Sequence, residues 1–242
     1  MGGTILNIIT VLIGTALGLL IGNRLPERIQ QTVITGIGLV TFYVGISNAG
    51  VSGNIIIPLL SLVIGAIIGE LLRLDLAFER LGGWLQARAG GHTSDAKDRV
   101  RFINGFVTAS LVFCIGPLTF VGSMQDGMGL PLGFQQLAIK STLDGFTALA
   151  FASSLGIGVG FSVITVLVIQ GGLALIGSQI GQIMTEPMIN EMTGVGGLML
   201  IGLALVLLEI KQPRIANFLP ALVIAPLMVA SATALGINIY PL

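Results

Sequence analysis

The sequence predicts an all-α protein, a polytopic bundle of about eight transmembrane helices. Composition favours this class, because 54% of the 242 residues are hydrophobic, only 9% are charged, and the mean hydropathy is +0.99. The charged residues are also segregated, and long stretches such as 145–185 and 215–242 contain none. A helix needs roughly 20 apolar residues to cross the hydrocarbon core of a bilayer. Stretches of this length therefore predict membrane-spanning helices.

Turn-forming residues divide the apolar stretches into about eight predicted helices. These helices cover residues 4–22, 31–49, 54–72, 102–124, 134–156, 159–183, 194–210 and 217–237. The first stretch lacks the basic segment and the cleavage site of a signal peptide, so we expect it to be a retained helix. We expect all the helices to belong to a single transmembrane domain over residues 1–242.

The basic residues predict the orientation of this bundle. Ten of the 11 lysines and arginines follow the first helix, lie in residues 73–101, or separate the last two helices. If the helices alternate in direction, these residues share one side, which the positive-inside rule makes cytoplasmic. Both termini would then lie on the outer side. The outer connections would be uncharged or acidic, as in the loop expected for "TEPMINEMT" at residues 185–193.

One cytoplasmic segment, residues 73–94, has an amphipathic pattern. Its apolar residues recur at helical spacing from Leu74 to Leu85, and its charged residues fall elsewhere on the helical wheel. This pattern is typical of a short helix that lies on the inner leaflet.

An internal repeat relates the two ends of the chain. At a shift of 159 residues, the glycines of "GLLIG" at 18–22 match those of "GSQIG" at 177–181. A motif of asparagine followed by proline also recurs at the start of the third and eighth helices. The two copies, residues 1–72 and 159–242, would run in opposite directions across the membrane. Inverted repeats of this kind occur in secondary transporters, whose substrate sites lie near the bilayer midplane.

The two central helices, within residues 95–156, resemble each other as well. "NGFVTASLVFCIG" begins at Asn104 and "DGFTALAFASSLG" begins at Asp144, with glycine and phenylalanine at the same spacing. Gly116 and Pro117 interrupt the first of these helices, because proline removes a backbone donor and clashes with the preceding turn. Backbone groups freed at such a break must face protein or a water-filled cavity. We therefore expect a cavity beside the central helices.

Three stretches of the chain resemble a known family. They are "GFVTASLVFCIGPLTFVGSMQDG" from Gly105, "KSTLDGFTALAFASSLGIGV" from Lys140 and "QGG" from Gln170. The sequence is similar along its whole length to the YqgA/YdfK-like proteins of the bacterial inner membrane, a family whose function is not established. The resemblance implies a compact polytopic fold in the inner membrane, with periplasmic termini in the orientation above. It suggests transport and supplies no substrate, reaction or catalytic residue.

Polar residues of the membrane segments gather in the middle of the chain. Lys140 and Asp144 stand four residues apart on one helix face, and ionisable groups at membrane depth usually face a cavity, a partner or an ion path. In the alternative, both residues lie at the outer interface and Lys140 reaches the headgroups. The candidate residues for binding a substrate or an ion are Asn104, Thr108, Ser110, Gly116, Pro117, Gln125, Asp126, Lys140, Ser141, Asp144, Ser153, Ser154 and Gln170.

Composition and motifs disfavour several other functions. A formal net charge of zero argues against a nucleic-acid partner. The chain has one cysteine, one histidine and no HExxH, CxxC or P-loop motif, so we expect no catalytic residue, no bound metal and no cofactor. The expected partners are the lipid bilayer and a small-molecule or ion substrate. Gly-x-x-x-Gly spacings allow close helix contact, either inside the chain or in a homo-oligomer.

We therefore expect a small secondary transporter or ion-coupled carrier whose pathway lies at the two central helices. Asp144 would bind the coupling ion, H⁺ or Na⁺, or the cationic part of a substrate, and hydroxyl groups would add neutral ligands. The alternatives are an ion or small-solute channel, and a membrane scaffold or sensor whose polar centre is structural. An enzyme is disfavoured, since the membrane segments hold no histidine and no paired carboxylates on a helix face for acid–base chemistry.

Overall fold

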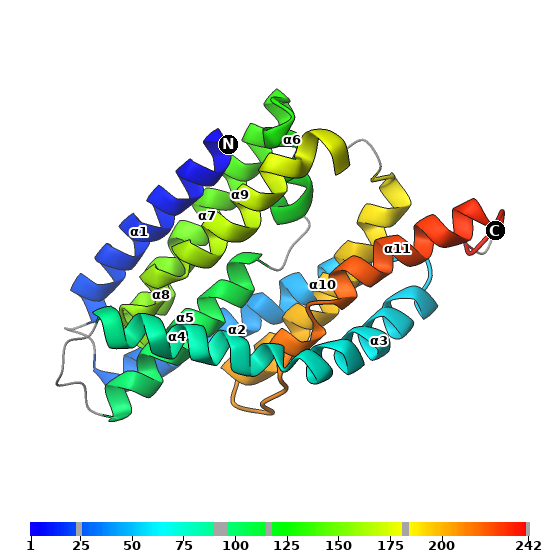
Figure 1. Ribbon diagram of the computed structural model, residues 1–242. Coiled ribbons are helices and arrows are strands. Elements are labelled where there is room, and N and C mark those ends of the chain that lie inside the picture. Colours follow the sequence, from blue (N-terminus) through cyan, green and yellow to red (C-terminus); the bar gives the residue numbers. More distant parts are fainter. Residues whose placement is uncertain (23–25, 90–95, 115–117, 181–183, 241–242) are drawn as a thin grey trace. The chain divides into compact units, whose positions relative to one another are not determined.

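The apolar stretches of the sequence form helices in the computed structural model, which describes residues 1–22, 26–89, 96–114, 118–180 and 184–240 (Figure 1). No strand occurs within these residues. The helices are α1 (Gly2–Gly22), α2 (Glu27–Ala49), α3 (Ile56–Leu72), α4 (Leu74–Ala89), α5 (Ala96–Cys114), the π-helical turn η2 (Leu118–Gly122), α6 (Ser123–Gly127), α7 (Pro131–Leu155), α8 (Gly158–Phe161), α9 (Val163–Ile180), α10 (Glu186–Leu207), the 3₁₀ turn η3 (Ile215–Phe218) and α11 (Ala221–Ala234). The predicted all-α class is confirmed.

Five helical segments of the described chain are long and apolar enough to cross a membrane. They are Gly2–Gly22, Gln31–Ala49, Gly158–Leu175, Glu186–Leu207 and Ile215–Ala234. Two bent helix pairs, α3 with α4 and α5 with Leu118–Gly127, raise the number to seven if each pair is one span. α7 has 25 residues but is not among these segments, because its charged, amide and hydroxyl side chains lower its hydropathy. The chain is thus a multi-pass membrane protein, and the count of eight helices stays a prediction.

α10 begins earlier than the sequence suggests. The loop expected over residues 185–193 is wrong, because α10 starts at Glu186. Thr185 precedes the helix in an extended conformation, and Pro187 lies in the first turn. The fixed φ of proline suits a helix, and proline loses no hydrogen bond at this position because N–H groups of the first turn have no acceptor within the helix. Glu191 is consequently a residue of α10 and not of a connecting loop.

The described chain divides into two compact units, each built from stretches that are distant in sequence. Unit 1 draws on Met1–Ile37, Ala77–Cys114 and Leu118–Gly181, and so contains α1, α5, α7 and α9. Unit 2 draws on Gly38–Leu76 and Gln182–Leu242, and so contains the second half of α2 with α3, α10 and α11. The single transmembrane domain expected from the sequence stays a prediction.

In unit 1, α1 and α7 lie side by side and run in the same direction (Figure 1). Gly3 faces Leu137 near one end of the pair and Gly22 faces Ser153 near the other, so residue numbers rise together along both helices. Between these contacts, a Cβ atom at Gly14 would overlap a backbone carbonyl oxygen of α7. Because glycine has no side chain, the two backbones approach this closely. The glycine face of α1 is therefore a packing surface inside unit 1.

The helix predicted between residues 73 and 94 is confirmed as α4. Leu85 is buried and packs with Phe102 and Phe106 of α5. Trp84 is exposed, and the guanidinium of Arg88 lies 4.7 Å from the centre of its ring. One side of α4 therefore contributes to the core of unit 1, and its place on the inner leaflet stays a prediction.

The helix pairs of unit 2 that the predicted repeat relates to each other pack antiparallel. Gly38 of α2 lies against Leu207 of α10, whereas Gly45 lies against Ile201, so residue numbers rise along one helix and fall along the other. α3 also packs antiparallel to the α11 region, because Gly65 lies against Ala221 and Gly69 lies against Asn217. Opposite directions are what an inverted repeat requires.

Two asparagines tie α3 and α11 together at opposite ends. Asn54, just before α3, donates a hydrogen bond from Nδ2 to the carbonyl oxygen of Ile239, which follows α11. Asn217, just before α11, accepts at Oδ1 a hydrogen bond of 2.8 Å from the N–H of Asp75, which follows α3. Each asparagine thus holds the backbone beyond the end of the other helix. The Asn-Pro motif noticed in the sequence corresponds to this reciprocal contact.

Candidate functional site

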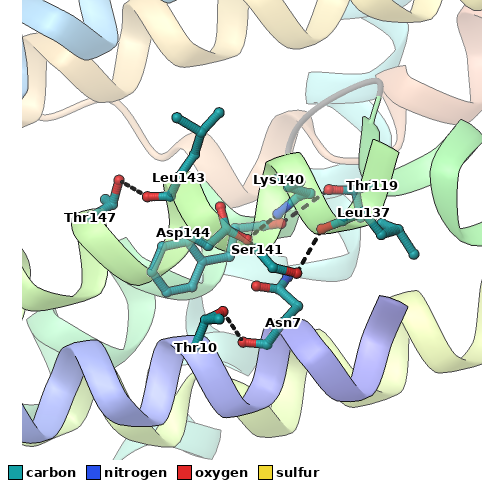
Figure 2. Close-up of polar contacts among 10 residues, drawn as sticks. Asn7, Thr10, Thr119, Leu137, Lys140, Ser141, Leu143, Asp144 and Thr147 are labelled. Carbon is teal, nitrogen blue, oxygen red and sulfur yellow. Dashed lines mark hydrogen bonds and ion pairs between the residues drawn. The ribbon is translucent and has the colours of Figure 1, made fainter. Parts of the chain in front are cut away.

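A buried ion pair lies inside unit 1. Lys140 and Asp144 occupy successive turns of α7, and the ammonium of Lys140 donates to Oδ2 of Asp144 (Figure 2). Asn7 of α1 donates from Nδ2 to the same carboxylate oxygen at 2.9 Å. Asn7 is fully buried, and Lys140 and Asp144 are only 6% and 7% exposed. The predicted pairing of Lys140 with Asp144 is confirmed, and protein side chains enclose the pair.

The packing of α1 on α7 explains how Asn7 reaches this pair. The spacing of four residues places Lys140 and Asp144 on one face of α7. The close, parallel approach of α1 brings Asn7 against that face (Figure 2). The sequence analysis did not single out Asn7. Its signal was present, because Asn7 is the only amide side chain in α1, and polar residues at membrane depth usually have a partner.

Several buried polar atoms have no hydrogen-bond partner among the described residues of unit 1. One is Oδ1 of Asn7, on the same amide that binds Asp144. Gln170 of α9 is fully buried, and neither its amide oxygen nor its amide nitrogen is paired. The others are Thr4 Oγ1, Thr15 Oγ1, Ser123 Oγ, Gln125 Oε1 and Gln136 Oε1. An unpaired buried polar group costs roughly 1–3 kcal/mol, so each of these atoms calls for a water molecule or a polar ligand beside it.

Four further candidate residues lie in unit 1 with local partners. Ser110 of α5 is buried and shares a hydrogen bond of 3.0 Å with Thr165 of α9. The hydroxyls of Ser141 and Ser153 donate to backbone carbonyl oxygens of α7, at 2.6 and 2.7 Å, and Ser154 is buried near the end of that helix. Ser110 thus links α5 to α9, whereas the hydroxyls of Ser141 and Ser153 bond within α7.

The remaining candidates differ in their surroundings. Thr108 is half-buried on α5, and Asn104 is exposed, so neither joins the ion pair. Gly116 and Pro117 lie outside the described residues. The helix direction differs by 79° between α5, before them, and Leu118–Gly127, after them. This change of direction agrees with the interruption expected in the first central helix.

Asp126 of α6 binds the beginning of α1. Its Oδ2 accepts a hydrogen bond of 3.1 Å from the N–H of Gly3 and lies 2.9 Å from the nitrogen of Met1. Asp126 is itself buried, and Gln125 beside it carries one of the unpaired oxygens. α6 therefore places a second carboxylate at the end of α1 that precedes Asn7.

Unit 2 contains a third buried carboxylate, Glu191 of α10. It is fully buried and accepts three hydrogen bonds, from the hydroxyl of Ser52 at 2.6 Å and from the N–H groups of Gly53 and Asn54 at 2.9 and 3.2 Å. No cation pairs with it among the described residues. The donors all come from the connection before α3, so Glu191 fixes that connection against α10. The sequence analysis missed this role because it placed Glu191 in a loop.

Tyr240 closes the same region. Its ring lies against Gly53, next to the bonds that Glu191 makes. Burial raises the pKa of Tyr240 to about 12, and the charge of Glu191 adds to this rise. The phenol therefore remains protonated well into the alkaline range.

The described residues contain no group of three or more His, Cys, Asp or Glu side chains that could hold a metal ion. In unit 1 the amide of Asn7 lies against the carboxylate of Asp144, and carboxylate and amide oxygens are ligands that suit hard cations. The Cys114 thiol of α5 is free and buried.

Comparison with known proteins identifies the family. A model of the family described as "Protein of unknown function (DUF554)" matches residues 2–230. The chain belongs to this family. This DUF554 protein is 34% identical over 233 residues to the "Uncharacterized protein YqgA" of Escherichia coli (strain K12), a match that covers 96% of this chain and 97% of that protein. It is 27% identical over 242 residues to the "Uncharacterized membrane protein YdfK" of Bacillus subtilis (strain 168), covering 98% and 100% of the two chains.

The resemblance of this chain to the YqgA/YdfK-like proteins is therefore confirmed. No solved structure matches the chain.

Proposed function

We propose that this DUF554 protein is a small secondary transporter, an ion-coupled carrier whose pathway lies in unit 1 along α5, α6 and α7. The observation that carries the proposal is the buried cluster of Asn7, Lys140 and Asp144. Ionisable residues inside membrane proteins are costly, and they commonly mark the path of an ion or a substrate. Here the charge pair is enclosed in a unit that also holds unpaired polar atoms.

A purely structural role accounts for this cluster less well. Replacing a buried ion pair by apolar residues of similar size is often neutral or stabilising. A network that served stability alone would also satisfy its own polar atoms, whereas Oδ1 of Asn7 has no partner among the described residues. The cluster is better explained by a ligand that supplies the missing interactions.

The helix arrangement is compatible with the inverted repeat that we propose for this carrier. α2 packs antiparallel to α10, and α3 to α11, as the repeat requires. Asn54 binds the backbone that follows α11 and Asn217 binds the backbone that follows α3, which is compatible with a half-turn between the third and eighth predicted helices. Inverted repeats support alternating access, in which one half rocks against the other around a central site.

We further propose that the protein lies in the bacterial inner membrane with both termini periplasmic. This orientation is supported by the basic residues, because ten of the 11 lie on the side of the predicted topology that the positive-inside rule makes cytoplasmic. Lipid and a small-molecule or ion substrate would be its partners. Contact between copies through glycine faces would have to use glycines other than Gly14, Gly18 and Gly22, which pack on α7.

The experiment is reconstitution of the purified protein in liposomes, with uptake measured against a panel of labelled inorganic ions and small solutes. We expect saturable uptake of at least one solute, accelerated by the same solute inside the liposomes. Asp144→Asn should abolish it, while the matched variant Asp98→Asn, at an exposed position on α5, should not. Size-exclusion profiles and helical content check that each variant is folded.

Three outcomes would contradict the proposal. Flux that does not saturate or exchange would indicate a channel. Uptake that persists in a folded Asp144→Asn variant would remove the site from the pathway. Absence of flux for every member of the panel would indicate a scaffold or sensor.

A further inference from the structure

We propose that Asp144 is shared in alternation by the ammonium of Lys140 and by a monovalent cation, so that the protein exchanges this cation for a proton. The inference rests on the proposed function and names the substrate class of the same site. It follows from the arrangement of oxygens around Asp144 and from the charge balance of the cluster.

Unpaired oxygens occur on Asn7, which binds Asp144, and on Thr4, which precedes Asn7 on α1. Both hydrogen bonds to this carboxylate end on Oδ2, and among the described residues none ends on Oδ1. Asn7 directs its amide nitrogen to Asp144, so its unpaired Oδ1 belongs to a group that is already held against the carboxylate. Thr4, one turn earlier on the same helix, adds a buried hydroxyl without a partner. Carboxylate, amide and hydroxyl oxygens are the ligands that hard cations prefer.

The charge of the cluster limits what can bind. One carboxylate is balanced by one ammonium, and an unbalanced charge in a desolvated site is strongly unfavourable. When a monovalent cation binds to Asp144, neutrality is kept only if Lys140 loses a proton. The ammonium then becomes a neutral amine, the proton passes to water, and the cation replaces the ammonium at the carboxylate. A divalent cation would leave an excess positive charge even after this exchange.

Lys140 is the group best placed to supply the proton. α1, η2 and α8, which pack on α7, contain no titratable side chain. α5 contributes Cys114, and α6 contributes Asp126, but neither makes a hydrogen bond with the pair among the described residues. The charged residues of α5, from Lys97 to Arg101, lie at its exposed beginning. The proton that is exchanged therefore comes from the residue that competes with the cation.

The test uses liposomes that contain the full-length protein and a trapped pH-sensitive dye. Na⁺, K⁺, Li⁺ or methylammonium is added outside, so that metal ions are compared with a small organic ammonium. Entry of the preferred cation should drive protons out and make the lumen more alkaline. Asp144→Asn should abolish both cation uptake and the dye signal, and Lys211→Met, at an exposed position, should leave both unchanged.

Two variants of Lys140 separate coupling from binding. Lys140→Met should still take up the labelled cation but lose the proton movement, so that uptake becomes electrogenic. Lys140→Arg keeps the positive charge, and an arginine side chain stays protonated in proteins. This variant should therefore remain folded but lose the exchange of cation for proton altogether. Lys140→Arg therefore keeps the test decisive if Lys140→Met does not fold.

The inference is overturned if no cation of the four moves protons through the wild-type protein, or if Lys140→Arg exchanges at the wild-type rate. Saturable uptake of another solute that depends on Asp144 but moves no cation and no proton would also overturn it. In that case the protein would still be a transporter. If no solute moves at all, the proposed function falls as well.

Discussion

At the scale of single residues, Asp144 and Glu191 show two ways of burying a carboxylate. Asp144 faces an ammonium and an amide, whereas Glu191 faces one hydroxyl and two backbone N–H groups. The first arrangement places a positively charged donor beside the carboxylate. The second surrounds the carboxylate with donors that cannot titrate, so Glu191 is suited to holding a connection in place.

The ion pair predicts a characteristic pattern of stability. Lys140→Met should lower the free energy of unfolding in detergent by about 3–5 kcal/mol, because it leaves a buried carboxylate without its cation. The double variant Lys140→Met with Asp144→Asn should recover most of this loss, since it removes both charges. Lys97→Met on the exposed face of α5 is the control and should change little. A double variant less stable than Lys140→Met would contradict the pairing.

Glu191 predicts a local effect on the connection before α3. Glu191→Gln keeps the shape but turns an N–H₂ group toward donors, so the amides of Gly53 and Asn54 should exchange hydrogen faster. Charge-assisted hydrogen bonds contribute roughly 1.5–3 kcal/mol each, which predicts at least a tenfold increase in exchange. Glu186→Gln, exposed on the same helix, is the matched control. Equal exchange in both variants would argue against the role of Glu191.

Tyr240 predicts a loss of stability at high pH. Its pKa is about 12 in the folded protein against an ordinary value of 10.0. The raised pKa means that the folded state holds the proton more tightly, so its contribution is complete below pH 10 and decreases as the pH rises toward 12. The melting temperature of the wild-type protein should therefore fall between pH 10 and pH 12. Tyr240→Phe should show a smaller fall over this range, whereas the control Tyr43→Phe should behave like the wild type. A decrease of the same size in Tyr240→Phe would reject the assignment.

At the scale of helices, the contact between α1 and α7 depends on Gly14. A Cβ atom there would overlap the carbonyl oxygen of Gly145, so Gly14→Val should separate the two helices and destabilise the fold by at least about 1–3 kcal/mol. A Cβ atom at Gly172 of α9 would meet no atom within 4 Å, which makes Gly172→Val the control. Unfolding in detergent, followed by circular dichroism, measures both. Similar stabilities would indicate that α1 and α7 are not in close contact.

Helices were more predictable from the sequence than the contacts between them. Long apolar stretches place α1, α3 and α11 within a few residues, because hydropathy alone determines where such a segment lies. The start of α10 was missed, since Glu186 and Glu191 make its first turns polar. The pairing of Lys140 with Asp144 was predictable from their spacing along one helix.

The partners of these residues were not predictable. Asn7 lies 137 residues from Asp144, and Ser52 lies 139 residues from Glu191. No periodicity relates positions so far apart, and only the packing of one helix on another brings them together. The sequence therefore identifies the carboxylates, but it does not predict the groups from other helices that form hydrogen bonds with them.

At the scale of the whole molecule, the proposed orientation can be tested by labelling single cysteines in a Cys114→Ser background. Val51 is 42% exposed in the connection before α3, and Lys97 is exposed at the beginning of α5. A membrane-impermeant maleimide added to intact spheroplasts should label Val51→Cys and should reach Lys97→Cys only after permeabilisation. The reverse pattern would invert the topology and place both termini in the cytoplasm.

The composition of unit 2 has a consequence for biosynthesis. α3 is made before the groups that hold its two ends, near Asn217 and Ile239, which lie much later in the sequence. Until then Gly65 and Gly69, which pack on residues 217–221, have only lipid or the insertion machinery beside them. A nascent chain therefore holds α3 without its partner helix until residues 217–239 have been made. Unit 2 can complete its assembly only after that point.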